Sequence, residues 1–115
     1  RAIELCTAIY ALTRTFPREE IYGLTNQLRR ASVSIPSSIA EGYGRGTKEQ
    51  YKQFLAIALG SYMELQTQLL IAKNLNLVDS TSYENVESLA SEVGRMLSAM
   101  LSNLRSSTKT LNPNP

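Results

Sequence analysis

Apolar residues recur at intervals of three and four along most of the chain, which is the spacing of one face of an α-helix. The first such stripe precedes Pro17 and consists of Leu5, Ile9, Leu12 and Phe16. Proline cannot continue a helix but fits the first turn of the next one, where its missing N–H costs nothing. The pattern therefore predicts one helix that ends at Pro17 and a second that begins there.

The second stripe passes straight through a proline. Its members are Ile21, Leu24, Leu28, Ala31, Ile35 and Ile39. A proline inside a helix loses one hydrogen bond and clashes with the carbonyl four residues back, at a cost of ~3 kcal/mol or a kink. We therefore predict one helix that is kinked at Pro36 and ends with Gly42 as its C-cap, since glycine tolerates the left-handed conformation of that position.

Two further helices follow, each with a start signal. Thr47 and Gln50 have the spacing of a capping box. The stripe behind them consists of Tyr51, Leu55, Ala58, Tyr62, Leu65, Leu69 and Ala72. Asn74 or Asn76 suits a left-handed stop. Asp79 or Thr81 is expected to cap the fourth helix, whose stripe consists of Val86, Leu89, Val93, Leu97, Met100 and Leu104.

No segment alternates with the period of two that strands require. We predict an all-α fold, an antiparallel up-down four-helix bundle over residues 1–106, with a disordered tail over 107–115. Some apolar side chains fall outside the main stripes: Phe54, Ile57, Ile71, Met96 and Leu101. A bundle of four helices needs one apolar face per helix, so this surplus predicts a second buried face and a homo-oligomer.

Composition removes several classes of function. The 115 residues contain no histidine and a single cysteine, Cys6, so the commonest general base is missing and a Cys/His zinc site cannot form. We therefore expect no enzyme, no cofactor and no bound metal. The cysteine usage is compatible with a cytoplasmic location. No apolar run approaches the ~18 to 20 residues that span a bilayer, and we expect no membrane association.

The glycines at Gly42, Gly44 and Gly46 raise the question of a phosphate-binding loop. A Walker loop follows a strand and places lysine directly after its last glycine, whereas here Lys48 comes one position late and a helix precedes. The dinucleotide fingerprint also fails, because Thr47 occupies the third glycine position. The segment is interpreted as a helix end, a turn and a new N-cap.

Two carboxylates stand beside apolar positions. Glu41 adjoins Gly42, and Glu64 lies midway between Ile57 and Ile71 on the third helix. A carboxylate on an apolar stripe requires a partner, and Arg29 and Arg30 are the natural candidates. Acid/base chemistry is disfavoured in a bundle without histidine. An ion pair between helices or a contact between subunits is the preferred interpretation for Glu64.

The net charge of +2 is too small to identify a partner, so the placement of charge matters more. The densest basic group lies around the second helix and its exit: Arg29, Arg30, Arg45 and Lys48. Tyr43 stands beside this exit and is able to stack on a base. Repeated around an oligomer, such residues would form a positive surface that suits RNA or DNA. A merely solvated face, on a scaffold that binds another protein, is the alternative.

The segment "LTNQLRRASVSIPSSIAEGYGR", Leu24 to Arg45, carries a resemblance, supported by "FPREEIYGL" (16–24) and "ELQTQLLIAKNL" (64–75). The chain resembles the small bacterial four-helix bundle proteins encoded in intervening sequences of 23S ribosomal RNA genes. The resemblance implies a four-helix bundle that assembles into a ring-like pentamer, and it does not imply an enzyme. A related branch, the accessory proteins of diversity-generating retroelements, binds nucleic acid and a reverse transcriptase. The motif positions are Arg29, Arg30, Glu41, Gly42, Arg45 and Glu64; Pro36 lies between them, and with Glu41, Gly42 and Glu64 it is a candidate for subunit contacts.

Overall fold

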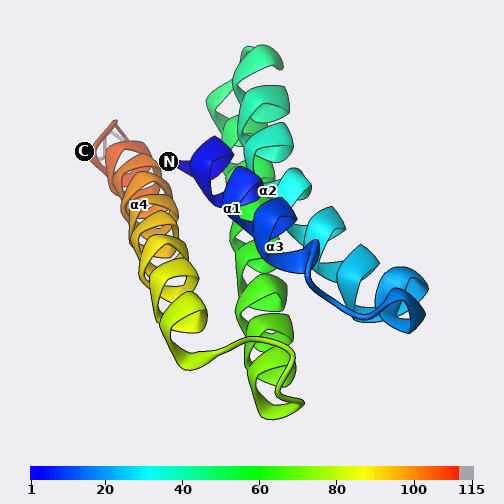
Figure 1. The fold of residues 1–115 in the computed structure, drawn as a ribbon. Helices are drawn as coiled ribbons and strands as arrows, with labels where there is room; N and C mark the ends of the chain where they lie inside the picture. Colours follow the sequence, from blue (N-terminus) through cyan, green and yellow to red (C-terminus); the bar gives the residue numbers. More distant parts are fainter. Residues whose placement is uncertain (112–115) are drawn as a thin grey trace.

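A computed structural model describes residues 1–111, and side chains are described through residue 106. The protein is all-α: four long helices are joined by short links, and residues 1–111 contain no strand (Figure 1). The helices are α1 (Ala2–Thr13), α2 (Asn26–Gly44), α3 (Lys48–Asn74) and α4 (Ser80–Leu111). A 3₁₀ turn, η1 (Arg18–Glu20), and a π-helical turn, η2 (Ile21–Thr25), lie between α1 and α2.

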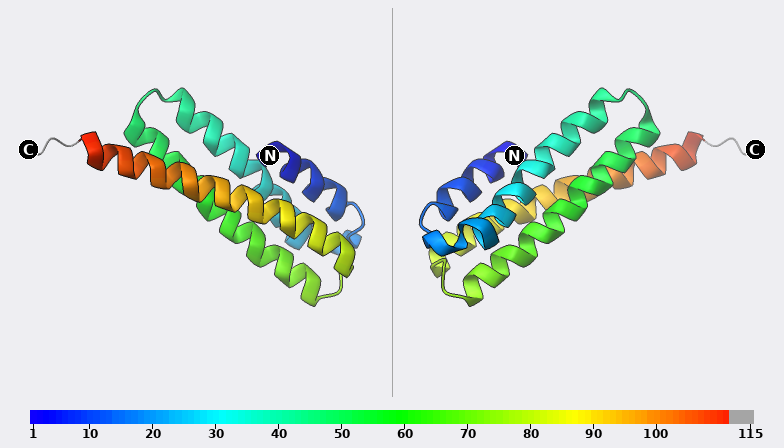
Figure 2. Two further views of the ribbon diagram at one scale, coloured as in Figure 1. Left: turned by 90° about the vertical axis from the view of Figure 1, so that its left-hand side faces the viewer. Right: turned by 90° about the vertical axis from the view of Figure 1, so that its right-hand side faces the viewer.

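The packing order places α3 between two long neighbours. It packs against α2 on one side and α4 on the other, and the short α1 packs against both α2 and α4. The α2–α3 link and the α3–α4 link lie at opposite ends of α3 (Figure 2). Because α1 has 12 residues and α4 has 32, α1 covers only part of the bundle.

Most members of the predicted stripes form the core, but Ile21 of the second stripe is exposed. On α3, all five aliphatic members of the stripe are fully buried: Leu55, Ala58, Leu65, Leu69 and Ala72. Leu28 and Ile35 on α2 are also fully buried, as the pattern predicts. One assignment is wrong: Leu101, taken as part of a surplus face, is 2% exposed and belongs to the core. Ile57 and Ile71 lie on the outside, 51% and 44% exposed.

The start of the second helix differs from the prediction. The chain first forms η1 and η2, and Gly23 has non-helical dihedral angles of φ −110° and ψ −114°. The carboxylate of Glu20 accepts the Leu24 backbone N–H at 3.4 Å, which satisfies a donor that the interrupted helix leaves open. Regular α-helix therefore begins only at Asn26, nine residues after Pro17.

The end of α2 also needs a correction. Gly42 is not the C-cap but a buried residue inside α2, which continues to Gly44. Glycine is required there by packing, because an added Cβ would lie 2.5 Å from Phe54 Cβ. The residue with the left-handed conformation is Gly46, at φ +87°. Thr47 then caps α3 as predicted, and its hydroxyl oxygen accepts the Gln50 N–H at 3.2 Å.

The remaining helix ends follow the sequence signals. Asn76 takes the left-handed conformation after α3, at φ 60°. Asp79 precedes α4, and its carboxylate accepts the Ser82 N–H at 2.8 Å. The helix continues to Leu111, inside the segment 107–115 for which a tail is expected. Residues 112–115 lie outside the described part, so the boundary of the domain stays a prediction.

By length and composition alone, α3 is long and apolar enough to cross a membrane. No such segment was expected from the sequence, because polar residues interrupt the apolar ones in α3. Its most buried stripe, however, packs against the other helices of the bundle. A core helix of a bundle passes the same test of length and hydropathy.

Candidate nucleic-acid interface

The five residues predicted to bind nucleic acid do not form one cluster. Arg29 and Arg30 lie in the first half of α2, whereas Arg45 and Lys48 flank the turn between α2 and α3. Fifteen residues of helix separate Arg30 from Arg45, which corresponds to about 22 Å at the α-helical rise. The two places must therefore be considered separately.

At the α2–α3 turn, the charge of Arg45 is already compensated. Its Nη2 lies 2.8 Å from the Glu41 carboxylate, and its guanidinium lies 5.1 Å from the centre of the Phe54 ring. Tyr43 is 77% exposed, and its ring meets Tyr51 edge to face at 6.0 Å. The turn thus offers an exposed aromatic ring but little uncompensated charge from Arg45.

Arg29 is held in place by α1. Its Nε donates a hydrogen bond of 2.8 Å to Thr13 Oγ1, and its guanidinium lies over the Tyr10 ring at 4.7 Å. Thr13 is buried and donates its own proton to the Ile9 carbonyl at 2.8 Å, which fixes the hydroxyl as an acceptor for Arg29. A guanidinium that is oriented in advance loses less conformational entropy on binding a ligand.

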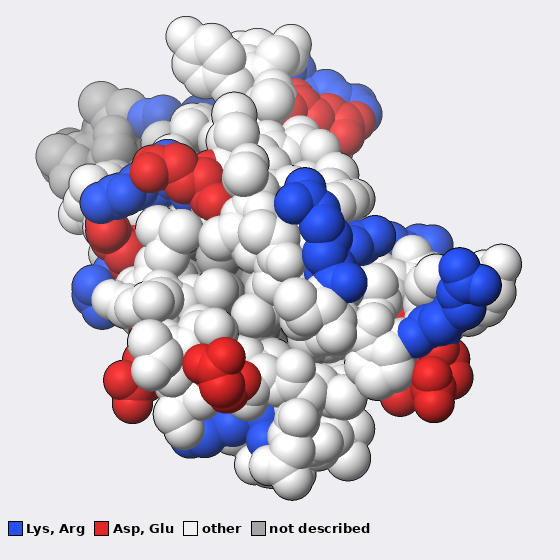
Figure 3. Space-filling view, viewed as in Figure 1, with Lys and Arg blue, Asp and Glu red and all other residues white. Residues whose placement is uncertain are grey.

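A pocket of about 520 Å³ opens between α1 and α2, and we call it the α1–α2 basic pocket. It is lined by Tyr10, Asn26, Arg29, Arg30, Val33, Ser34 and Ser37. No acidic residue is in this lining, and in the described part of the chain neither arginine forms an ion pair. Figure 3 shows basic side chains gathered on the side of the molecule that α1 and α2 form. Two uncompensated arginines, with hydroxyl and amide donors around them, constitute an anion-binding arrangement.

A second hollow, about 450 Å³, lies between α2 and α3, and we call it the α2–α3 groove. Its lining is Gln27, Arg30, Ala31, Ser34, Ser61, Glu64 and Gln68. The two serine hydroxyls are 2.8 Å apart and link the helices. Glu64 lines this groove together with Arg30, but it forms no ion pair with Arg29 or Arg30, so the predicted pair is absent from the described chain.

The other predicted subunit contacts have roles within the chain. Pro36 is half-buried in α2, Glu41 pairs with Arg45, and Gly42 packs against Phe54. For these residues and for Glu64, a contact with a second copy stays a prediction.

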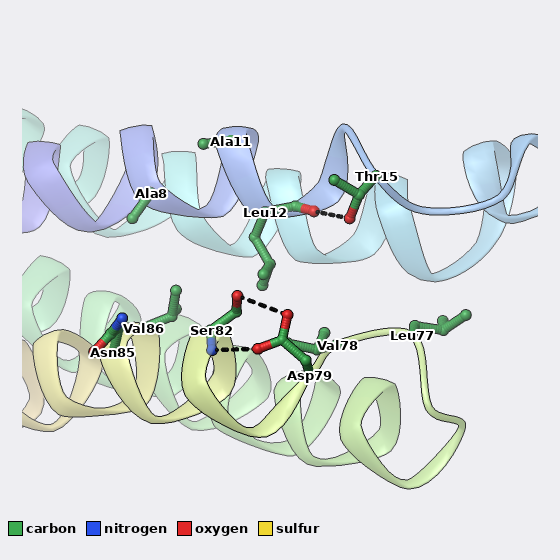
Figure 4. A pocket seen from close by; sticks show the side chains of 10 residues that line it. All are labelled: Ala8, Ala11, Leu12, Thr15, Leu77, Val78, Asp79, Ser82, Asn85 and Val86. Atoms are coloured by element: carbon green, nitrogen blue, oxygen red, sulfur yellow. Dashed lines mark hydrogen bonds between the residues drawn. The ribbon is translucent and has the colours of Figure 1, made fainter.

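The groove between α1 and α4 is mostly apolar and carries no apparent chemistry (Figure 4). Its one charged lining residue among those described is Asp79, which caps α4 through the backbone N–H and hydroxyl of Ser82. These hydrogen bonds hold the pKa of the Asp79 carboxyl below its ordinary value. Within the described residues, no group of three or more His, Cys, Asp or Glu side chains is placed to hold a metal ion.

Tyr10 and Thr13, which hold Arg29, were not among the residues predicted from the sequence. Tyr10 is exposed on α1 and lines the α1–α2 basic pocket. The contact from Thr13 to Arg29 joins two helices and has no signature in the local sequence.

A comparison with models of protein families matches residues 1–99 to the 23S rRNA-intervening sequence protein. The chain belongs to this family. The matched region includes both arginines of the α1–α2 basic pocket and Glu64 of the α2–α3 groove. A search among curated proteins found no match. Membership confirms the resemblance expected from Leu24 to Arg45.

Proposed function

We propose that this protein is a non-enzymatic cytoplasmic bundle that binds RNA or DNA through the α1–α2 basic pocket. The observation that supports the proposal is the pair Arg29 and Arg30, which share one pocket with no acidic residue in its lining. Arginine presents a fork of N–H donors that matches phosphate, and contacts to phosphate supply most of the sequence-independent affinity for nucleic acid. Membership in a family named for 23S rRNA intervening sequences favours RNA as the partner.

A double substitution tests this location. Arg29→Ala with Arg30→Ala should weaken binding to single-stranded RNA and DNA of any sequence, because it removes two phosphate contacts. For single strands, the slope of log affinity against log salt should flatten by about 0.7 for each contact that is lost. Fluorescence anisotropy with a labelled oligonucleotide measures both quantities.

The matched control removes the same charge from α4. Arg95 and Arg105 are exposed and form no ion pair in the described chain, so Arg95→Ala with Arg105→Ala should leave most of the affinity intact. Equal losses in both double variants would mean that net charge, and not the pocket, governs binding. Arg45→Ala with Lys48→Ala probes the α2–α3 turn, and a larger loss there would move the interface to that end of α2.

We also propose the finer architecture: antiparallel up-down order, a bend of α2 at Pro36, and a ring-like homo-oligomer. The links at opposite ends of α3 support the order. Pro36 lacks the N–H that would bond the Ser32 carbonyl, which supports the bend. Exposed apolar side chains on α3 support the oligomer: Ile57, Met63, Leu70 and Ile71 are 44% to 59% exposed. In a ring, the basic pocket would recur once per copy and provide several phosphate contacts together.

The alternative is a scaffold that recruits another protein without binding nucleic acid. The same exposed side chains of α3 favour it, because large apolar patches mark protein interfaces. It predicts no affinity for RNA or DNA at physiological salt, and this separates it from the first proposal.

A further inference from the structure

The α1–α2 basic pocket and the α2–α3 groove adjoin each other on α2. Arg30 and Ser34 line both of them, so the two hollows meet along this side of the helix. Their chemistry differs. The basic pocket offers cationic donors around an aromatic ring, whereas the groove contains a carboxylate and two amides in addition to Arg30. A ligand that extends from one into the other would present an anion to the first and a hydrogen-bonding surface to the second.

The groove holds exposed charged groups of both signs, Arg30 and Glu64. Within the described chain, neither Arg30 nor Glu64 forms an ion pair, and no side chain donates a hydrogen bond to the Glu64 carboxylate. The Gln68 Oε1 is buried and accepts no hydrogen bond from the described residues. The volume of the groove lies within the range of small-molecule sites, about 300 to 1,000 Å³. The groove is thus equipped with strong donors, a strong acceptor and room for a planar polar ligand.

We propose that the α2–α3 groove binds an unpaired guanine base, whose phosphate lies in the α1–α2 basic pocket. This inference rests on the proposed nucleic-acid binding and specifies its ligand. At a guanosine, Arg29 holds the phosphate, and Arg30, which lines both hollows, donates to guanine O6 and N7 as a bidentate pair. Glu64 is the acceptor for the opposite edge, where guanine presents two neighbouring donors, N1–H and the N2 amine.

The other bases match this pair of side chains less well. A carboxylate finds two adjacent donors only on guanine, because cytosine and adenine offer one exocyclic amine each and uracil offers one ring N–H. The base must also be unpaired, since Watson–Crick pairing occupies the edge that Glu64 requires. Proteins commonly read RNA in this way, through bases that are splayed out of loops and single strands.

Short oligouridines with one central guanosine, adenosine, cytidine or uridine test the proposal on the full-length chain. Fluorescence anisotropy should show that the guanosine oligomer binds about tenfold more tightly than the others, the order expected from one bidentate base contact. Inosine at the same position lacks the N2 amine and should lose part of this preference. 7-Deazaguanosine lacks N7 and should lose the part contributed by Arg30.

Glu64→Gln separates recognition of the base from attraction to the phosphates. The substitution removes a negative charge, so affinity for plain oligouridine should stay the same or rise. The preference for guanosine should nevertheless disappear, and inosine and guanosine should then bind alike. Glu84→Gln is the matched control. It makes the same change at an exposed position of α4 and should keep the preference for guanosine.

Three results would overturn the inference. If oligouridine binds with the expected salt dependence but guanosine adds nothing, the guanine site is wrong while the proposed function survives. If no oligonucleotide binds, both fail together. If Glu64→Gln lowers the mass of the assembly in light scattering, Glu64 is a contact between copies and not a ligand for a base.

Discussion

Gly42 and Gly44 are two residues apart in α2 but differ in what surrounds them. A Cβ on Gly42 would lie 2.5 Å from Phe54 Cβ, whereas nothing lies within 4 Å of a Cβ on Gly44. The absence of a side chain at Gly42 lets α2 approach α3 closely. Sequence reasoning identified this glycine as special but assigned it to a helix cap, because a contact between helices leaves no periodic pattern. The same limit hid the hydrogen bond from Arg29 to Thr13, although the arginines themselves were recognised.

The two glycines provide a matched pair of substitutions. Gly42→Ala should lower the free energy of unfolding by about 1 to 3 kcal/mol, because the added methyl group overpacks against Phe54. Gly44→Ala should leave the free energy unchanged or raise it by up to about 1 kcal/mol, since alanine restricts the unfolded chain. Urea denaturation measures both. Equal destabilisation by the two substitutions would contradict the close approach of α2 to α3.

The starts of α3 and α4, which have side-chain caps, were predicted correctly from the sequence. The irregular start of the second helix, where η1 and η2 precede α2, was not. Thr47 and Asp79 cap α3 and α4 as their spacing predicts, and the apolar stripes identify the buried faces. The region after Pro17 carries the usual signals of a helix start, yet it forms η1 and η2 because Gly23 leaves helical geometry. Propensity alone does not reveal which of several adjacent starts the tertiary fold selects.

The cap at Asp79 makes a prediction about pH. Hydrogen bonds from Ser82 lower the pKa of the folded carboxyl below its ordinary value of 3.8. The ionised carboxylate therefore stabilises the fold above that value, and this contribution is lost as the pH falls through the folded pKa. Asp79→Asn keeps a capping oxygen but does not titrate. Wild type should be more stable than this variant at neutral pH, and urea denaturation should show the difference vanish in acid. A difference that stays constant with pH would contradict the assignment.

At the scale of the whole molecule, the sequence correctly predicted four helices, no strands in the described residues, and apolar side chains in excess on the third helix. It could not locate the α1–α2 basic pocket, because this pocket is formed by residues of two helices. The predicted basic residues lie at two separate places along α2. Arg29 and Arg30 line the α1–α2 basic pocket without an ion pair in the described chain, whereas Arg45 at the α2–α3 turn pairs with Glu41.

The exposed apolar side chains of α3 predict an assembly that charge can disrupt. Met63→Glu with Leu70→Glu should reduce the mass seen by light scattering toward the monomer's 12.7 kDa, since it places two carboxylates in the proposed interface. Ser88→Glu with Ser102→Glu adds the same charge at exposed positions of α4 and should leave the mass unchanged. A wild-type protein that is already monomeric at micromolar concentration would refute the oligomer.

The central claim, that the α1–α2 basic pocket binds nucleic acid, is tested most directly by titrating wild-type protein with single-stranded RNA and DNA across a series of salt concentrations. If the pocket binds nucleic acid, a logarithmic plot of affinity against salt should be linear and fall steeply, and it should flatten when Arg29 and Arg30 are both replaced by alanine. Absence of binding at the lowest salt, or binding with the same salt dependence in the double variant, would contradict it.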